Sequence, residues 1–155
     1  MSQVDCSRLV PLSQMRGDSE TDTTFLQLMA AEAKAFVGAF DWCKGVREVY
    51  FGCGIGGVIG AFLFNVVPST TEVDQLLWVI VGDVPPAYLV TDESPTPASA
   101  LRAYVHEMRH WVAAAEAGES VDDLIPVNVA PTEEHALALK KRLDYIEREI
   151  IPTCT

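Results

Sequence analysis

The chain has 155 residues, of which 49% are hydrophobic, and its 22 acidic and 11 basic side chains give a formal net charge of −11. A chain of this length fits one domain with a substantial core, and its apolar content excludes a disordered tail protein and a collagen-like fibre. The acidic balance argues against nucleic-acid binding, because excess carboxylates repel phosphate.

The first residues are polar and show no hydrophobic periodicity, so we expect a loose N-terminal lead-in over residues 1–20 and a single domain over residues 21–155. Residues 21–23 offer side chains that can cap a helix, and apolar residues at helical spacing follow as far as Phe40. Gly45 is the predicted stop. These signals predict an amphipathic helix at the start of the domain.

Four stretches rich in β-branched and aromatic residues follow, and they predict strands. They cover residues 46–53, 58–67, 76–81 and 87–91. A glycine-rich turn at residues 54–57 would join the first two strands as a hairpin. The third stretch is apolar throughout, which is typical of a strand at the centre of a sheet.

Two helices are predicted after the strands. Thr96 is an N-cap followed by proline at the first helical position, and Gly118 ends this helix after Ala117. The last helix opens after Pro131 with acidic residues in its first turn. Its apolar face consists of Ala136, Leu139, Leu143, Ile146 and Ile150. The order of elements predicts an α+β fold: a three- to four-stranded, mainly antiparallel sheet with the N-terminal helix and the two C-terminal helices packed on one face.

A membrane span is an alternative for one part of the chain. Val49–Val67 is nineteen residues long and uncharged, and Gly52, Gly56 and Gly60 recur at every fourth position. This pattern has the length of a spanning helix and the spacing of small residues that helix packing in membranes uses. The many strand-favouring residues and the glycines favour two strands instead, so we expect no membrane association.

The cysteines and the N-terminus indicate a compartment. The four cysteines are widely spaced and form no C-x-x-C motif, so we expect unpaired thiols in a reducing cytoplasm, with a Cys43–Cys53 disulfide as the alternative. Cys6 and Cys154 lie near the chain ends. The N-terminus lacks the basic-then-apolar pattern of a secretory signal, which also favours the cytoplasm.

One motif could carry enzyme chemistry. His106, Glu107 and His110 form an H-E-x-x-H match inside the first C-terminal helix, and this stretch resembles the motif of zinc peptidases. The resemblance implies that the two histidines bind zinc and that Glu107 acts as the base towards the bound water. Glu133 or Glu134 could supply a third ligand from the next helix. A minimal zinc-dependent hydrolase is therefore the alternative function.

The phase of the helix argues against this chemistry. The apolar stripe is centred near Met108, and at about 100° per residue the histidines lie roughly 160° from it, on the solvent face. Catalytic zinc needs ligands that point into a cleft. Arg109, a charged residue inside the motif, is available to Glu116 or to other nearby acids. We expect no cofactor, and adventitious metal binding rather than catalysis by the exposed histidine pair.

The distribution of charge favours a binding function. No basic residue lies between Arg47 and Arg102 or between Arg109 and Lys140, whereas acids are frequent in both stretches. Acids gathered at one end of the domain would steer a basic protein partner, although excess acid also serves solubility alone. The sequence therefore predicts a non-enzymatic domain, of the kind seen in immunity or inhibitor proteins, that binds a basic protein. The predicted partner-binding residues are Asp83, Asp92, Glu93, Asp122 and Asp123.

Two stretches resemble a known group of proteins. Residues 77–89, which read Leu-Trp-Val-Ile-Val-Gly-Asp-Val-Pro-Pro-Ala-Tyr-Leu, and residues 121–128, which read Val-Asp-Asp-Leu-Ile-Pro-Val-Asn, are similar to small, uncharacterised bacterial proteins. The resemblance extends over most of the chain after about residue 45. It implies a bacterial source and a cytoplasmic setting, and it implies no activity.

Overall fold

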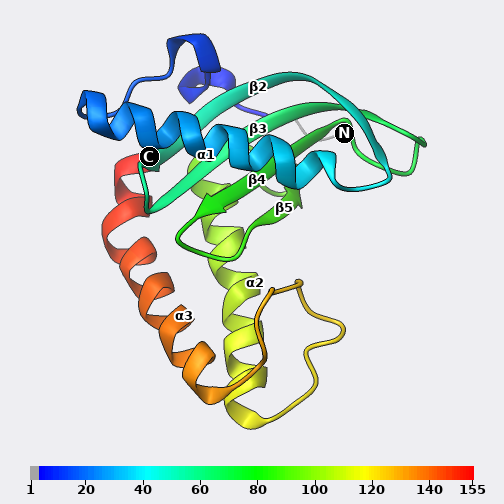
Figure 1. Cartoon of the computed structure of the whole chain (residues 1–155), viewed down its shortest axis with the longest axis vertical. Helices are drawn as coiled ribbons and strands as arrows, with labels where there is room; N and C mark the ends of the chain where they lie inside the picture. The colour runs from blue at the N-terminus through cyan, green and yellow to red at the C-terminus, as the bar shows by residue number, and fades with distance from the viewer. Residues whose placement is uncertain (1–3) are drawn as a thin grey trace.

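The computed structural model describes residues 4–155 and confirms the α+β class. Five strands form one antiparallel sheet in the order β1-β2-β3-β4-β5, so the strand count is slightly higher than predicted. Three α-helices and several short helical turns complete the domain (Figure 1). In chain order the elements are η1 (Cys6–Arg8), β1 (Val10–Pro11), η2 (Leu12–Gln14), α1 (Glu20–Gly38), β2 (Cys43–Ile55), β3 (Ile59–Pro68), β4 (Leu76–Gly82), β5 (Ala87–Val90), α2 (Pro97–Ala117), α3 (Glu133–Tyr145), η3 (Ile146–Ile150) and η4 (Ile151–Cys154).

Strands β2 to β5 form a meander of consecutive hairpins, and β1, which α1 separates from β2 in the chain, pairs with the outer side of β2. β2 and β3 pair as far as Ile55 opposite Ile59, and Gly57 takes a positive φ of 78° in the turn between them. This is the predicted glycine-rich hairpin, in which glycine adopts a backbone conformation that other residues rarely reach. β4 and β5 then add in sequence, which leaves β5 as one edge of the sheet.

Helices cover both faces of the sheet. α1 packs on one face, where Leu26 and Val37 meet Phe62 and Val79, and α2 and α3 pack on the other, where Ile80 is buried. Figure 1 shows α1 in front of the sheet and α2 behind it. The prediction of helices on one face was wrong. Alternate residues of β3 and β4 are buried on opposite faces, which explains why these two strands are apolar almost throughout.

The segment before α1 belongs to the fold. Residues 1–3 lie outside the described part, but residues 4–19, which were expected to be loose, form η1, β1 and η2. Val10 pairs with Phe51 of β2, and Met15 is fully buried against α1 and its sheet face. The segment is therefore ordered by long-range contacts that its own polar sequence does not reveal.

Side chains fix the start of α1 at Ser19, slightly earlier than predicted. The Ser19 hydroxyl accepts a hydrogen bond from the Asp22 N–H, which is an N-cap contact. The Asp22 carboxylate accepts from the Gly56 N–H at 2.5 Å and from the Asp18 N–H at 2.8 Å. Asp22 thus joins the helix to the β2–β3 turn.

The two C-terminal helices begin where the sequence predicts. Thr96 and Ser99 form a reciprocal capping box at the start of α2, and Gly118 ends it with φ 69°. The Thr132 hydroxyl caps α3 by accepting from the His135 N–H. All five residues of the predicted apolar face of the last helix are buried, and the helix continues through a π-helical turn, η3, into η4.

A disulfide joins Cys53 of β2 to Cys154 in η4, with 5.7 Å between the two Cα atoms. The prediction of four unpaired thiols was wrong for this pair, and so was the Cys43–Cys53 alternative. Cys6 and Cys43 are unpaired. The spacing of 101 residues gave no local signal, because only the packing of the C-terminal helix against the sheet brings the two sulfur atoms together.

The uncharged stretch at residues 49–67 forms most of the β2–β3 hairpin, so the spanning-helix alternative was wrong. Within residues 4–155, no helix has both the length and the apolar composition that crossing a bilayer requires.

Candidate functional site

Three of the five predicted partner-binding acids meet at one place. A depression of about 630 Å³ lies between the end of β5, α2 and the loop after α2. Asp92 and Glu93 line it from the turn after β5, Asp123 lines it from the loop, and Glu107 lines it from α2. Among the described residues that line it, there is no Lys, Arg or His. We call this hollow, with the four acids Asp92, Glu93, Glu107 and Asp123 in its lining, the acidic depression.

The turn that carries Asp92 and Glu93 is held by hydrogen bonds on both sides. The Ser94 N–H donates to the Thr91 carbonyl at 3.1 Å, which closes the turn. The indole N–H of fully buried Trp78 donates to the Ser94 carbonyl at 2.7 Å, and the Asp5 N–H donates to the Pro95 carbonyl at 2.7 Å. These bonds fix the backbone, so the two carboxylates project from a rigid support.

The opposite wall is the loop between α2 and α3. Gly118 turns the chain out of α2, and the Leu124 N–H donates to the Val121 carbonyl at 3.0 Å. Val121, Leu124 and Ile125 are half-buried against the core on the α2 side of the sheet. This apolar anchoring holds the loop in place and leaves Asp123 exposed at the depression.

The other two predicted acids lie elsewhere. Asp83, after β4, forms an ion pair with Arg142 of α3 at 3.1 Å, and it borders different hollows of the surface. Asp122 is exposed next to Asp123 but does not line the acidic depression. The structure therefore brings together three of the five predicted acids and adds Glu107, which the sequence suggested only as a catalytic base.

The acidic depression suits an organic cation. Its carboxylates are exposed or half-exposed, and they face a hollow large enough for a side chain. Carboxylates bind an arginine guanidinium through paired, charge-assisted hydrogen bonds, and they bind a lysine ammonium as a point charge. Within residues 4–155, no group of three or more His, Cys, Asp or Glu side chains has the geometry to hold a metal ion.

The histidines of the H-E-x-x-H motif lie on the solvent face of α2, as the helix phase predicts. His106 and His110 are exposed, and their ring centroids are 4.5 Å apart. Met108 is fully buried on the opposite side of the helix. Glu133 and Glu134 are exposed in the first turn of α3, and the described residues include no third ligand placed with the histidine pair. The zinc-hydrolase alternative therefore remains a prediction from the motif alone.

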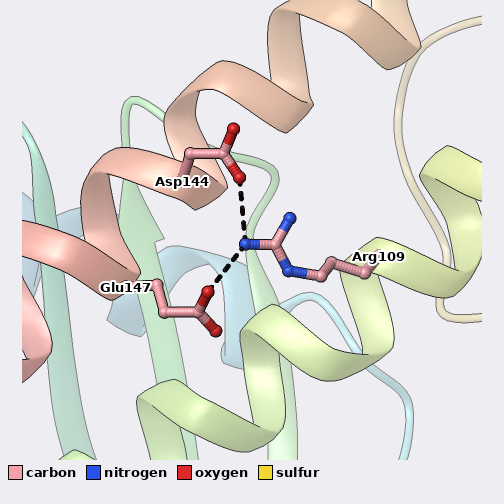
Figure 2. A network of polar contacts seen from close by, with 3 residues as sticks. All are labelled: Arg109, Asp144 and Glu147. Carbon is pink, nitrogen blue, oxygen red and sulfur yellow. Dashed lines mark hydrogen bonds and ion pairs between the residues drawn. The ribbon is translucent and has the colours of Figure 1, made fainter.

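Arg109 of the motif joins α2 to the last helix. Its Nη2 atom lies 3.1 Å from Asp144 Oδ1 and 3.1 Å from Glu147 Oε1, and Figure 2 shows both carboxylates approaching the guanidinium from the neighbouring helix. Both partners lie on the last helix, Asp144 in α3 and Glu147 in η3. Glu116, one partner that the sequence suggested, is not among them. The charged residue inside the motif has a structural role at this position.

An aromatic cluster beside β5 was not predicted as a site. The cluster consists of Phe36 in the last turn of α1, Phe40 and Trp42 just after the helix, and Tyr88 of β5. The ring centroid of Phe40 lies 5.1–5.3 Å from those of the other three. Phe36, Phe40 and Tyr88 border a second depression, of about 600 Å³. The available signal was the helical apolar stripe that runs to Phe40, with Trp42 two residues further on. We call these four residues the aromatic cluster.

Comparisons with known proteins add no relative: no protein-family model matches the chain, and no match is found among the curated proteins or the solved structures.

Proposed function

We propose that this chain is a non-enzymatic protein-binding domain that recognises a basic protein partner through the acidic depression. The observation that carries the proposal is the convergence of Asp92, Glu93, Glu107 and Asp123, from three separate segments, on one hollow. Its lining, as far as residues 4–155 form it, has no basic side chain. A protein that neutralises a basic partner, as immunity and inhibitor proteins do, is the most concrete form of this function.

The charge of the whole chain supports the same partner. A net charge of −11 attracts a basic protein from a distance and raises its association rate, and a local group of carboxylates fixes where it docks. If the acidic residues served solubility alone, there would be no reason for four of them to line one hollow. Nucleic acid is a poor partner for such a surface, because its phosphates carry the same sign of charge.

Charge reversal tests the proposal. The site variant is Asp92→Lys, Glu93→Lys and Asp123→Lys, and the matched control is Glu72→Lys, Asp74→Lys and Glu116→Lys. Each triple variant changes the net charge from −11 to −5, since each substitution adds +2, but the three control residues are exposed and lie outside the acidic depression.

The assay is capture of a partner from the extract of the source cells, followed by calorimetry with the purified partner at low and moderate salt. We expect a basic partner whose affinity falls about a hundredfold with the site variant, because three reversals of about 1 kcal/mol each act together. The control should bind within about threefold of the unmodified protein. Equal losses in the two variants would contradict a localised site, and an acidic or neutral partner would contradict the proposal itself.

The cytoplasmic setting remains a prediction, and the Cys53–Cys154 disulfide provides its test, since such bonds persist mainly in oxidising compartments. Rapid alkylation of thiols in intact cells, followed by mass spectrometry, would find this pair reduced in the cytoplasm. Finding it oxidised would place the protein outside that compartment.

A further inference from the structure

The outer edge of β5 borders a continuous groove. In the described part of the chain β5 pairs only with β4, so its other side is an edge of the sheet. At one end of the strand, Tyr88 and Val127 both line the 600 Å³ depression. At the other end, Val90 and Asp123 both line the acidic depression. Ile125 borders both hollows, so they adjoin along the edge, and we call them together the edge groove.

The two walls of the edge groove run in opposite directions. Residues 86–88 line one hollow together with residues 125–128, and residues 89, 90 and 92–94 line the other together with residues 123–125. Figure 1 shows the chain between α2 and α3, in yellow to orange, running beside α2, and Leu124, Ile125 and Val127 pack against the core on that side. Within residues 4–155, no backbone hydrogen bond joins this loop to β5. The loop is therefore a wall of the groove and does not extend the sheet.

An edge strand presents backbone N–H and C=O groups that can pair with an additional strand. The ladder with β4 uses only the groups on one side of Ala87–Val90. The groove beside the other side is bordered by Phe36 and Phe40 on the α1 side and by Ile125 on the α2 side. An extended peptide placed there would have backbone partners on β5 and side-chain contacts on both sides.

The two ends of the edge groove differ in chemistry. One end is bordered by the half-exposed rings of Phe40 and Tyr88 and accepts an apolar side chain. The other end is the acidic depression, which accepts a cation. Tyr88 and Asp92 are four residues apart in the chain, so a bound strand would need its apolar and basic residues about four positions apart.

We infer that the edge groove binds an extended segment of the partner protein as a sixth strand, with an apolar side chain against the aromatic cluster and an arginine or lysine in the acidic depression. This inference rests on the proposed function and adds the mode of recognition. Charge complementarity selects the partner over a second copy of this chain, since two copies joined at this edge would bring two acidic depressions and two net charges of −11 together.

Synthetic peptides test the inference on the full-length protein. The probes are acetyl-Thr-Leu-Thr-Val-Thr-Arg-amide, in which leucine and arginine are four positions apart on one face, and its reverse sequence, because the direction of pairing is open. One matched pair of controls carries N-methyl groups on one or the other alternate set of backbone nitrogens. The peptide methylated on the set that faces β5 cannot donate to the strand, and every side chain is kept. The other control carries glutamate in place of arginine. Binding is followed by amide chemical shifts and by the exchange rates of the β5 amide hydrogens.

We expect one of the two arginine peptides to bind and to slow exchange at β5, with about tenfold weaker binding after N-methylation and about tenfold weaker binding after the glutamate replacement. Unchanged binding of both N-methylated peptides would overturn the strand-pairing inference and leave the proposed function standing. Equal binding of the glutamate peptide would instead contradict the acidic depression as the site. Failure of every peptide to bind would overturn the inference, because the groove would then bind no extended segment. A dimer in light scattering that a peptide dissociates would also overturn it, because a second copy of this chain would then be the occupant of the groove.

Discussion

Replacing Cys154 with alanine tests how much the Cys53–Cys154 bond contributes to stability. The bond links residues 101 positions apart, so it closes about two thirds of the chain into a loop. In the chain-entropy relation, a loop of this size lowers the entropy of the unfolded chain by an amount equal to about 4.7 kcal/mol at 25 °C. Alanine keeps the buried position apolar, so loss of the cross-link should dominate the effect. We expect the free energy of unfolding to fall by about 3–5 kcal/mol.

The measurement is urea unfolding of the oxidised protein, with the slope against urea compared between variants, because removing a cross-link also expands the unfolded state. Adding Cys53→Ala to Cys154→Ala should produce little further loss, since the bond is already absent. Cys43→Ala is the matched control, because Cys43 is unpaired and half-buried. Thiol counting on the native oxidised protein should find only Cys6 and Cys43 reactive. Four reactive thiols, or no change in unfolding free energy for Cys154→Ala, would refute the cross-link.

Three further predictions concern the buried Tyr104, the Asp22 carboxylate and the exposed histidine pair. Burial raises the pKa of Tyr104, whose hydroxyl donates to the Pro85 carbonyl at 2.5 Å. Above about pH 10 the tyrosine loses its proton in the unfolded chain and keeps it in the folded protein. The free energy of unfolding therefore falls by up to about 1.4 kcal/mol per pH unit as the pH rises. Tyr104→Phe should flatten this fall, and identical alkaline slopes in urea titrations would contradict it. Asp22→Ala removes the acceptor of the Gly56 N–H and should destabilise by about 1–2 kcal/mol in thermal melts, whereas an unchanged melting temperature would show that this contact is dispensable. Tag-free protein purified without added zinc should contain well under one zinc per chain, and His106→Ala should not change its fold or stability; one tightly held zinc that disappears in the variant would revive the hydrolase alternative.

Local signals in the sequence were sufficient for the main helices and strands but not for the segment before α1 or for how the elements are arranged. The caps at Thr96 and Gly118 and the glycine-rich turn of the first hairpin depend on neighbouring residues, and the structure has them where the sequence predicts. The Val10–Pro11 strand and the Cys53–Cys154 bond depend on partners about 40 and 101 residues away, and neither was predicted. The double burial of β3 and β4 was visible in their continuous apolar runs, and it could have predicted helices on both faces.

For the candidate site too, the sequence identified single residues but not how the fold groups them. Exposed acids in loops were identifiable because charged residues rarely lie in a core. Their grouping was not, since it depends on where Trp78 holds the turn after β5 and on how Leu124 anchors the loop after α2. Asp83 was predicted with the others, but the structure pairs it with Arg142 instead.

The meander order of the sheet also determines how the chain can fold as it is synthesised. Neighbouring strands in the sheet are neighbours in the sequence, so the sheet and α1 can assemble before α2 has been made, and loop closure adds little entropic barrier between consecutive hairpins. During that interval the sheet face that includes Ile59, Ala61 and Ile80 has no cover, because α2 and α3 supply it last. The nascent chain therefore presents an apolar surface to chaperones and to other nascent chains until its final third emerges from the ribosome.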